Sequence, residues 1–260
     1  MGWIKNIPLN LLLIVMLCSH PPAQGIFFKS LLPSKGTIYP NRVESYPAAG
    51  YVHGFGISRY SDIDPERAFS EAYESALQDL NSSLMTSVRL EFYGTGNLQP
   101  RLHSEFAIQD DLDMENVISK DSMQVENWAV YIIGHKEREG ILPQSLMNHP
   151  SVQKPVGDYF NPVQIENYWV ASGSATYSMY NAYRSFTLAK QDALQNLSTH
   201  IQTIVQGSQR ALNESLSSIN YQTSRNVFSN IHVIKRERED DRVHILIAVK
   251  EEDVLTWREE

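Results

Sequence analysis

An internal repeat constrains the fold of this chain more than any other feature of its sequence. Residues 56–88 align with residues 173–205 without a gap, and 12 of the 33 positions are identical. The clearest part of the match pairs RAFSEAYESALQDL (67–80) with RSFTLAKQDALQNL (184–197). Self-similarity of this kind predicts two copies of one supersecondary unit within the 260 residues.

Each copy begins with an extended segment that is followed by a helix. Residues 51–60 and 168–177 alternate with a period of two, and one face of each carries small residues that include Gly56 and Gly173. The next segment repeats with a helical period and has alanines on its apolar stripe. The stripe residues are Phe69, Ala72, Ala76, Leu80, Leu84 and Val88 in the first copy, and Phe186, Ala189, Ala193, Leu197, Ile201 and Val205 in the second. We therefore expect each helix to pack closely on the glycine face of its strand.

Two further strands close each copy. WAVYIIGHKE (128–137) matches RVHILIAVKE (242–251) with a three-residue shift, and each segment follows another extended stretch after a polar turn. This pattern is typical of a β-hairpin. The predicted strands are 115–125 and 128–136 in the first copy, and 229–236 and 242–250 in the second. Residues 91–111 are predicted to be a loop and residues 208–227 to be helical, which is the largest expected difference between the copies.

These elements predict an α+β fold of two tandem β-α-β-β units, each with a long Ala-rich helix packed on a small antiparallel sheet. Asp64-Pro65 and Asn181 are suitable N-terminal caps for the two helices. Four prolines between the units, with few periodic apolar positions, indicate a linker. The predicted organisation is a signal peptide (1–25), an irregular N-terminal arm (26–49), a first unit (50–137), a Pro-containing linker (138–166) and a second unit (167–260).

The final strand of each copy is apolar on both faces, whereas a helix can cover only one of them. The second face must therefore meet the other unit, another subunit or a partner protein. The residues that we assign to such an interface are Trp128, Val130, Ile132, Tyr131, Ile245 and Ile247. Hydrophobic burial would drive the association, and it favours a homo-oligomer or a complex with another protein.

The first 25 residues have the pattern of an export signal. A short segment with one cation precedes an apolar core from Ile7 to Leu17, which is too short to span a bilayer, and small residues precede a cleavage position after Gly25. Cys18, the only cysteine, stands where a bacterial lipoprotein is acylated, but the bulky Leu17 precedes it. Cys18 is thus either a lipidation site or part of a discarded signal, and a lipid anchor would be the only attachment to a membrane.

Charge and composition argue against two classes of protein. The chain has a formal net charge of −8, and its basic run KRER (235–238) is followed at once by EDD. Because an acidic surface repels a phosphate backbone, we expect no binding of nucleic acid. The apolar fraction of 42% is too high for a disordered chain.

Arg67 and Arg184 are the best candidates for a binding site, because both copies retain an arginine at this position. A cation in the first helical turn is at the unfavourable end of the helix dipole, so a compensating anion is expected. That anion is either a small anionic or glycan ligand, such as a peptidoglycan carboxylate, or a carboxylate of the same unit in an ion pair.

The sequence offers no recognisable constellation for catalysis or for a metal. The histidines lack metal-binding spacing, and His53, His135, His232 and His244 would cluster only if the fold brought their strands together. The acidic run DDLDMEN (110–116) lacks the glycine and the final glutamate of a calcium loop. We therefore expect no metal, no cofactor and no enzymatic activity.

Three of these features together resemble a known bacterial family. They are the glycine-containing strand, the Arg-led alanine helix that ends in AL-x-x-L, and the final hairpin that closes in a Val/Ile-rich strand and Lys-Glu. This combination, which covers nearly all of 51–137 and 168–254, is similar to the envelope lipoprotein family typified by the twenty-kilodalton Helicobacter lipoprotein. Relatives of that family include flagellar basal-disk and H-ring accessory proteins. The resemblance implies a protein of the periplasm or outer membrane that acts in assembly or surface interaction. Cleavage of the leader after Gly25 would also allow a secreted protein.

Overall fold

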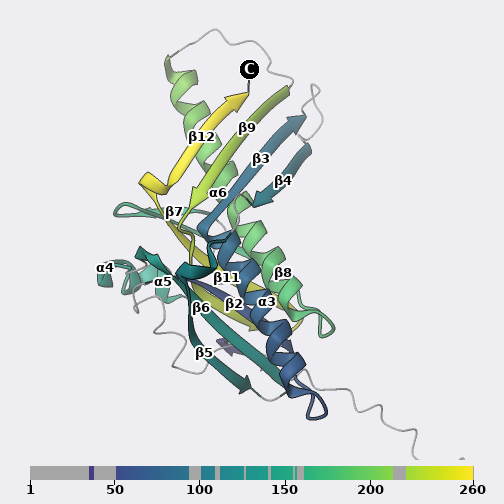
Figure 1. Ribbon diagram of the computed structural model, residues 1–260. Coiled ribbons are helices and arrows are strands. Elements are labelled where there is room, and N and C mark those ends of the chain that lie inside the picture. The colour runs from purple at the N-terminus through teal and green to yellow at the C-terminus, as the bar shows by residue number, and fades with distance from the viewer. Residues whose placement is uncertain are drawn as a thin grey trace, which may run out of the picture. The chain divides into compact units, whose positions relative to one another are not determined.

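The computed structural model describes residues 35–37, 51–93, 101–108, 112–125, 127–139, 142–154, 156, 161–212 and 221–259. These residues form a mixed α+β structure of helices and antiparallel sheets, as predicted (Figure 1). The predicted signal peptide with Cys18 lies outside the described residues, as does most of the predicted N-terminal arm.

The first sheet has three strands in the order β2-β6-β5 and carries the helix α3 on one face. Its elements are β2 (Tyr51–Arg59), α3 (Pro65–Leu84), β5 (Val117–Val125) and β6 (Trp128–Glu139). Neighbouring strands are antiparallel throughout.

The second sheet has five strands in the order β1-β10-β11-β8-β7 and packs against the long helix α6. Its elements are β1 (Lys35–Thr37), β7 (Val163–Ile165), β8 (Tyr168–Thr176), α6 (Ala182–Leu212), β10 (His232–Glu239) and β11 (Arg242–Lys250). Within it, β8-β11-β10 repeats the strand order β2-β6-β5 of the first sheet. The strand β1 lies in the arm that we predicted to be irregular, where it pairs with β10.

The third sheet joins strands from both halves of the chain in the order β12-β9-β3-β4 (Figure 1). Its elements are β3 (Met85–Tyr93), β4 (Arg101–Ile108), β9 (Tyr221–Ser229) and β12 (Val254–Glu259). One face meets α6, since the Ser104 hydroxyl donates to Gln195 Oε1 (2.7 Å) and the Ser224 hydroxyl donates to Gln202 Oε1 (3.0 Å). The central pairing of β3 with β9 makes the two halves one continuous structure.

Both helices pack on glycines, as the small-residue faces predict. A Cβ atom added at Gly54 or Gly56 would collide with backbone atoms of α3 at Ala72 and Ala76. A Cβ atom at Gly173 would collide in the same way with Ala189 and Ala193 of α6. The predicted caps are also confirmed, because the side chains of Asp64 and Asn181 accept hydrogen bonds from the backbone N–H groups of Arg67 (3.1 Å) and Arg184 (2.9 Å).

Three predictions about the segments after the helices are wrong. The first helix ends at Leu84, and its predicted stripe residue Val88 is a buried residue of β3. Residues 101–108 of the predicted loop form β4, and residues 221–227 of the predicted helix belong to β9. Thr86, Val88 and Leu90 alternate with Ser87, Arg89 and Glu91, so this stretch also fits the period of a strand. Its pairing with β4 on one side and β9 on the other decides the outcome.

The predicted linker is part of the hydrophobic core. It contains α4 (Gln144–Met147) and α5 (Pro150–Gln153), although the four prolines of this segment are typical of a linker. Its buried side chains pack against the face of the second sheet opposite α6. The cluster consists of Leu142, Leu146, Val152, Val156, Ile165, Tyr168, Val170, Ile234, Leu246 and Ala248. The second face of this sheet is therefore covered by residues 142–154 and 156 of the same chain, and not by the other unit or by a partner as predicted.

The residues predicted to form an intermolecular interface are also placed in the interior. Trp128, Val130, Ile132, Ile245 and Ile247 are at most 4% exposed, and Tyr131 is partly buried beside α3. Trp128, Val130 and Ile132 are paired with β2 residues on the face turned away from α3. Phe55 of that face contacts Phe186 of α6, with ring centroids 5.8 Å apart, so this face meets the other half of the chain.

Candidate functional site

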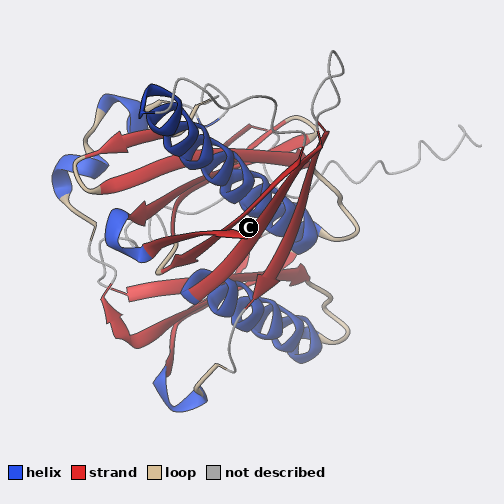
Figure 2. Ribbon diagram, turned by 90° about the horizontal axis from the view of Figure 1, so that it is seen from above, coloured by secondary structure: helices blue, strands red, loops and turns tan. Residues whose placement is uncertain are grey.

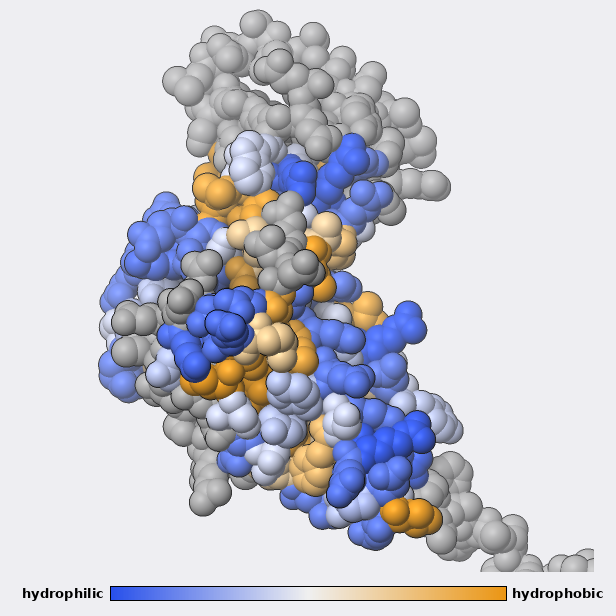
Figure 3. Space-filling view, viewed as in Figure 1, coloured by the Kyte–Doolittle hydropathy of each residue, from blue (hydrophilic) through white to orange (hydrophobic). Residues whose placement is uncertain are grey.

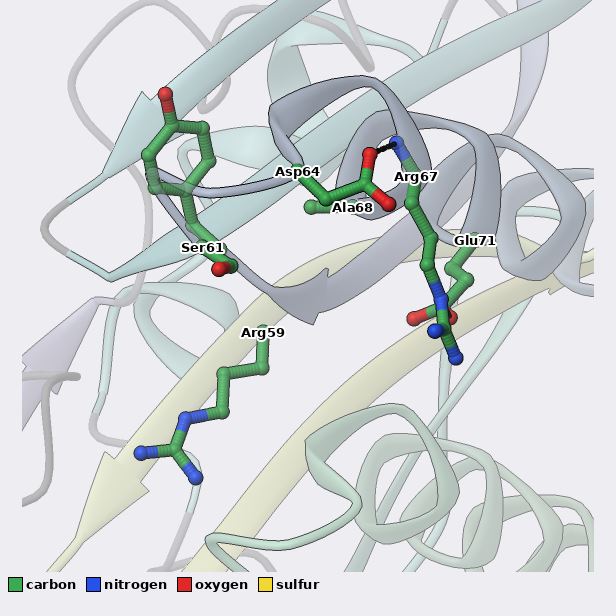
Figure 4. A pocket seen from close by; sticks show the side chains of 7 residues that line it. Arg59, Ser61, Asp64, Arg67, Ala68 and Glu71 are labelled. Atoms are coloured by element: carbon green, nitrogen blue, oxygen red, sulfur yellow. Dashed lines mark hydrogen bonds and ion pairs between the residues drawn. The ribbon is translucent and has the colours of Figure 1, made fainter.

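Arg67, the first predicted binding residue, lies at the rim of an open pocket at the start of α3 (Figure 4). The lining residues are Arg59, Tyr60, Ser61, Asp64, Arg67, Ala68 and Glu71. The Arg67 side chain is 75% exposed, and its Nε lies 2.8 Å from Glu71 Oε1. This hydrogen bond with Glu71 raises the pKa of Arg67. The compensating anion is thus a carboxylate of the same helix, which corresponds to the structural alternative considered for this residue.

Arg184, the second predicted binding residue, occupies the same position at the start of α6. It is exposed, and its backbone N–H donates to the capping side chain of Asn181. Arg184 is not among the residues that line the pocket beside Arg67. The structure therefore does not combine the two arginines into one pocket.

A buried charge network between the two halves was not predicted from the sequence. Asp79 of α3 accepts hydrogen bonds from Lys190 Nζ of α6 (3.0 Å), from Arg236 Nη2 of β10 (3.0 Å) and from the Phe55 backbone N–H of β2 (2.9 Å). Lys190 Nζ also donates to the hydroxyls of Ser82 (2.8 Å) and Ser83 (2.6 Å). The side chains of Lys190 and Arg236 are each 3% exposed, and that of Asp79 is 9% exposed. One carboxylate is thus enclosed by two cations.

The charged groups of the network shift one another's pKa values. Burial alone would raise the pKa of Asp79, but Lys190 and Arg236 together hold it below its usual value. Burial lowers the pKa of Lys190, and the adjacent Asp79 carboxylate opposes this effect. The network fastens α3, α6, β2 and β10 together through three charged side chains that are almost fully buried.

Two buried histidines stand next to this network. Burial, with a further contribution from Arg236, lowers the pKa of His53 to about 3. Burial lowers the pKa of His232 to about 4, and the two histidines are close enough for His232 to affect the pKa of His53. Both are therefore neutral in the folded protein at neutral pH. The described residues contain no group of three or more His, Cys, Asp or Glu side chains arranged to hold a metal.

The third sheet exposes apolar side chains on both of its end strands, Leu255 and Trp257 on one face and Ile108 on the face that carries Ser104. Leu255 and Trp257 of β12 are 52% and 49% exposed, and Ile108 of β4 is 53% exposed. Thr256 Oγ1 bonds Asn226 Oδ1 on the α6 side, so Leu255 and Trp257 lie on the opposite face because side chains alternate along a strand. Apolar residues are visible over this sheet between hydrophilic regions (Figure 3). The strands β12 and β4 are the two ends of the sheet.

None of the described helices has the length and apolar character needed to cross a membrane. Comparisons of the chain with protein-family models, with curated proteins and with solved structures each gave no match.

Proposed function

We propose that this chain is a non-enzymatic, exported protein of the bacterial cell envelope that works by associating with itself or with other envelope proteins. The predicted leader in residues 1–25 and the resemblance to envelope lipoproteins and flagellar accessory proteins support the location. The observation that carries the mode of action is the third sheet, because it combines exposed apolar residues with two end strands, β4 and β12, that have one strand neighbour each among the described residues.

We also propose that the two halves are copies of one β-α-β-β unit that were joined by duplication. The shared strand order, β2-β6-β5 and β8-β11-β10, supports this origin. The equivalent helix–strand contacts at Gly56 and Gly173 support it further. The third sheet would then be the part that each copy contributes to the joint structure, through β3 and β4 on one side and β9 and β12 on the other.

Association through the ends of the third sheet has a simple geometry. An edge strand presents backbone N–H and C=O groups that can pair with another strand. β4 and β12 run in opposite directions within the sheet, because each successive pair of strands is antiparallel. A second copy in the same orientation could therefore add its β12 to β4 and continue the antiparallel pattern. Repetition of this head-to-tail contact would produce a ring or a layer.

The test is the oligomeric state of the purified protein without its leader. Light scattering should find an oligomer for the parent chain and a monomer for a double variant, Leu255→Lys with Trp257→Lys, which adds charge to the exposed face beside β12. Gln78→Lys on the exposed side of α3 is the matched control, and it should leave the oligomer intact. A parent chain that stays monomeric at high concentration and that binds no envelope protein contradicts the proposal.

A second candidate function is the binding of a small anionic or glycan ligand at Arg67 and Arg184. The pocket that contains Arg67 is lined by the guanidinium groups of Arg59 and Arg67 and by the carboxylates of Asp64 and Glu71. An anionic ligand would therefore have to replace Glu71 as the partner of Arg67. Calorimetric titration with soluble peptidoglycan fragments tests this function. The double variant Arg67→Ala with Arg184→Ala should lose binding if the function is correct, whereas absence of heat with the parent chain excludes these fragments as the ligand.

A further inference from the structure

Two turns at equivalent positions of the repeat each expose one large apolar or aromatic side chain. Ile63, in the turn between β2 and α3, is 96% exposed, and Tyr180, in the turn between β8 and α6, is 88% exposed. The gapless alignment pairs these two residues with each other. Single exposed apolar side chains are common on protein surfaces, but these two are exposed at the same point in both copies although their burial would be favourable.

The roots of both turns are held in place by equivalent contacts. The Tyr60 backbone N–H donates to Asn127 O (2.7 Å), and the Tyr177 backbone N–H donates to Asp241 O (2.6 Å). Each bond ties the turn to the hairpin of the same sheet. In addition, the Tyr60 ring packs on Phe69 with centroids 6.1 Å apart. The exposed residues therefore project from ordered positions, and little conformational freedom would be lost if they were bound.

The position of each residue makes its exposure more informative. Ile63 and Tyr180 directly precede the capping residues of their helices, where an apolar residue commonly folds back onto the first helical turn. Ala68 and Ser185, the residues on which they would pack, are buried, yet the side chains of Ile63 and Tyr180 are exposed to solvent. Rigid apolar groups that project from a surface are typical anchors of protein interfaces.

The two turns lie toward the same end of the two helices in both ribbon views (Figures 1 and 2). Acidic residues lie beside both turns and outnumber the exposed arginines there, which are Arg59, Arg67, Arg184 and Arg242. The exposed acidic residues are Asp62, Asp64 and Glu66 beside the first turn, and Glu239, Asp240 and Asp241 in the hairpin beside the second. The charge of this end agrees in sign with the net charge of −8.

We propose that Ile63 and Tyr180 form one docking face for a protein partner whose surface is basic and contains two apolar pockets. The acidic surroundings of both turns are complementary to such a partner. They oppose contact of this face with the same face of a second copy, and they oppose an anionic lipid surface. This inference goes beyond the association through the third sheet, because it uses different residues at a different place.

Site-specific photo-crosslinking in the cells that make the protein tests this proposal. A photoreactive phenylalanine analogue is placed at position 63, at position 180, or at the exposed control position Gln78 of α3. Positions 63 and 180 should yield an adduct with one and the same protein, identified by mass spectrometry, and position 78 should not. No adduct, equal adducts at all three positions, or adducts with a second copy of the chain overturn the proposal.

The identified protein is then purified to measure its affinity directly. Ile63→Ser and Tyr180→Ser should each weaken binding about tenfold or more, and added salt should weaken it further. The double variant Leu255→Lys with Trp257→Lys should bind normally, which separates this proposal from the one on the third sheet. Unchanged affinity of both serine variants overturns the proposal. A vesicle flotation assay gives a further test. If the isolated chain floats with phosphatidylglycerol vesicles and the two serine variants do not, the face binds lipid and the proposal is overturned.

Discussion

Asp79 and Lys190 form a buried ion pair of 3.0 Å that joins the helix of the first half to the helix of the second. The two residues are 111 positions apart, and Arg236 holds the second oxygen of the same carboxylate. Because both cations are almost fully buried, the negative charge of Asp79 is needed to offset the free-energy cost of removing them from water.

Replacement of Asp79 by alanine is therefore expected to destabilise the protein severely. Lys190 and Arg236 would be left as uncompensated buried charges, and the expected loss is about 3–5 kcal/mol in the free energy of unfolding. Urea unfolding followed by circular dichroism measures it. Asp62→Ala in the exposed first turn is the control, and its effect should stay within about 0.5 kcal/mol. A loss at Asp79 no greater than that of the control would contradict the role assigned to the network.

The glycines under the helices lead to a second prediction. Gly56→Ala and Gly173→Ala place a methyl group against the backbone of α3 and α6, which cannot yield as a flexible side chain does. Each substitution should lower the free energy of unfolding by about 1–3 kcal/mol or more. Thr176→Ala, at the exposed end of the same strand as Gly173, is the matched control and should have little effect. Parent-like stability of both alanine variants would show that the helices can move away at no cost.

A third prediction concerns the segment that looks like a linker. Leu146 is fully buried in the cluster on the second sheet, so Leu146→Ala should cost about 2–5 kcal/mol. Gln144→Ala, on the same short helix but exposed, should be nearly neutral. Limited proteolysis offers a second readout, because a true linker is cut readily in the parent chain whereas a core segment is cut only in the Leu146 variant.

The sequence was informative wherever the structure depends on local periodicity. The alternation that brings Gly56 and Gly173 to one face, and the helical spacing of their alanine partners, lie within single segments and can be recognised directly. Val88 fits a helical and a strand pattern equally well, and its pairing with Phe106 of β4 and with Asn226 of β9 makes it a strand residue. Such non-local pairing leaves no local signal.

The buried network shows the same limit. The alignment pairs Asp79 with Asn196, and both side chains bond the neighbouring strand, Asp79 to the Phe55 N–H and Asn196 to the Ser172 carbonyl (3.0 Å). A polar residue at this equivalent position in both copies, next to the apolar stripe, could have been recognised in the sequence as a helix–strand contact. Nothing comparable marks Lys190, which is aligned with Tyr73, so its burial against Asp79 could be known only from the packing of the two halves.

The arginines at the helix starts are expected to contribute little to folding. Arg67 and its partner Glu71 are both exposed, and ion pairs of this type are screened by solvent. The double variant Arg67→Ala with Arg184→Ala should therefore unfold at nearly the same urea concentration as the parent. A large shift of that midpoint would assign the arginines a structural role and would remove the main reason to consider them as a ligand site.

The two buried histidines predict that the protein loses stability in mild acid. The pKa values of His53 and His232 are about 3 and about 4 when folded but close to 6.5 when unfolded, so between these values the unfolded chain binds more protons. Stability is therefore complete above pH 6.5 and falls as the pH drops through the window between 6.5 and about 3–4. Between pH 7 and pH 5 each histidine should remove about 2 kcal/mol.

Unfolding in urea at a series of pH values checks this dependence and its source. The slope of unfolding free energy against pH between 6 and 5 should correspond to the uptake of about two protons or more, because burial also lowers the pKa of His244. The slope should fall by about one proton in a His53→Gln or a His232→Gln variant. The lowered pKa of Asp79 acts in the same direction only at more acidic pH, where that carboxylate begins to be protonated. A slope that neither substitution reduces would show that other groups cause the acid sensitivity.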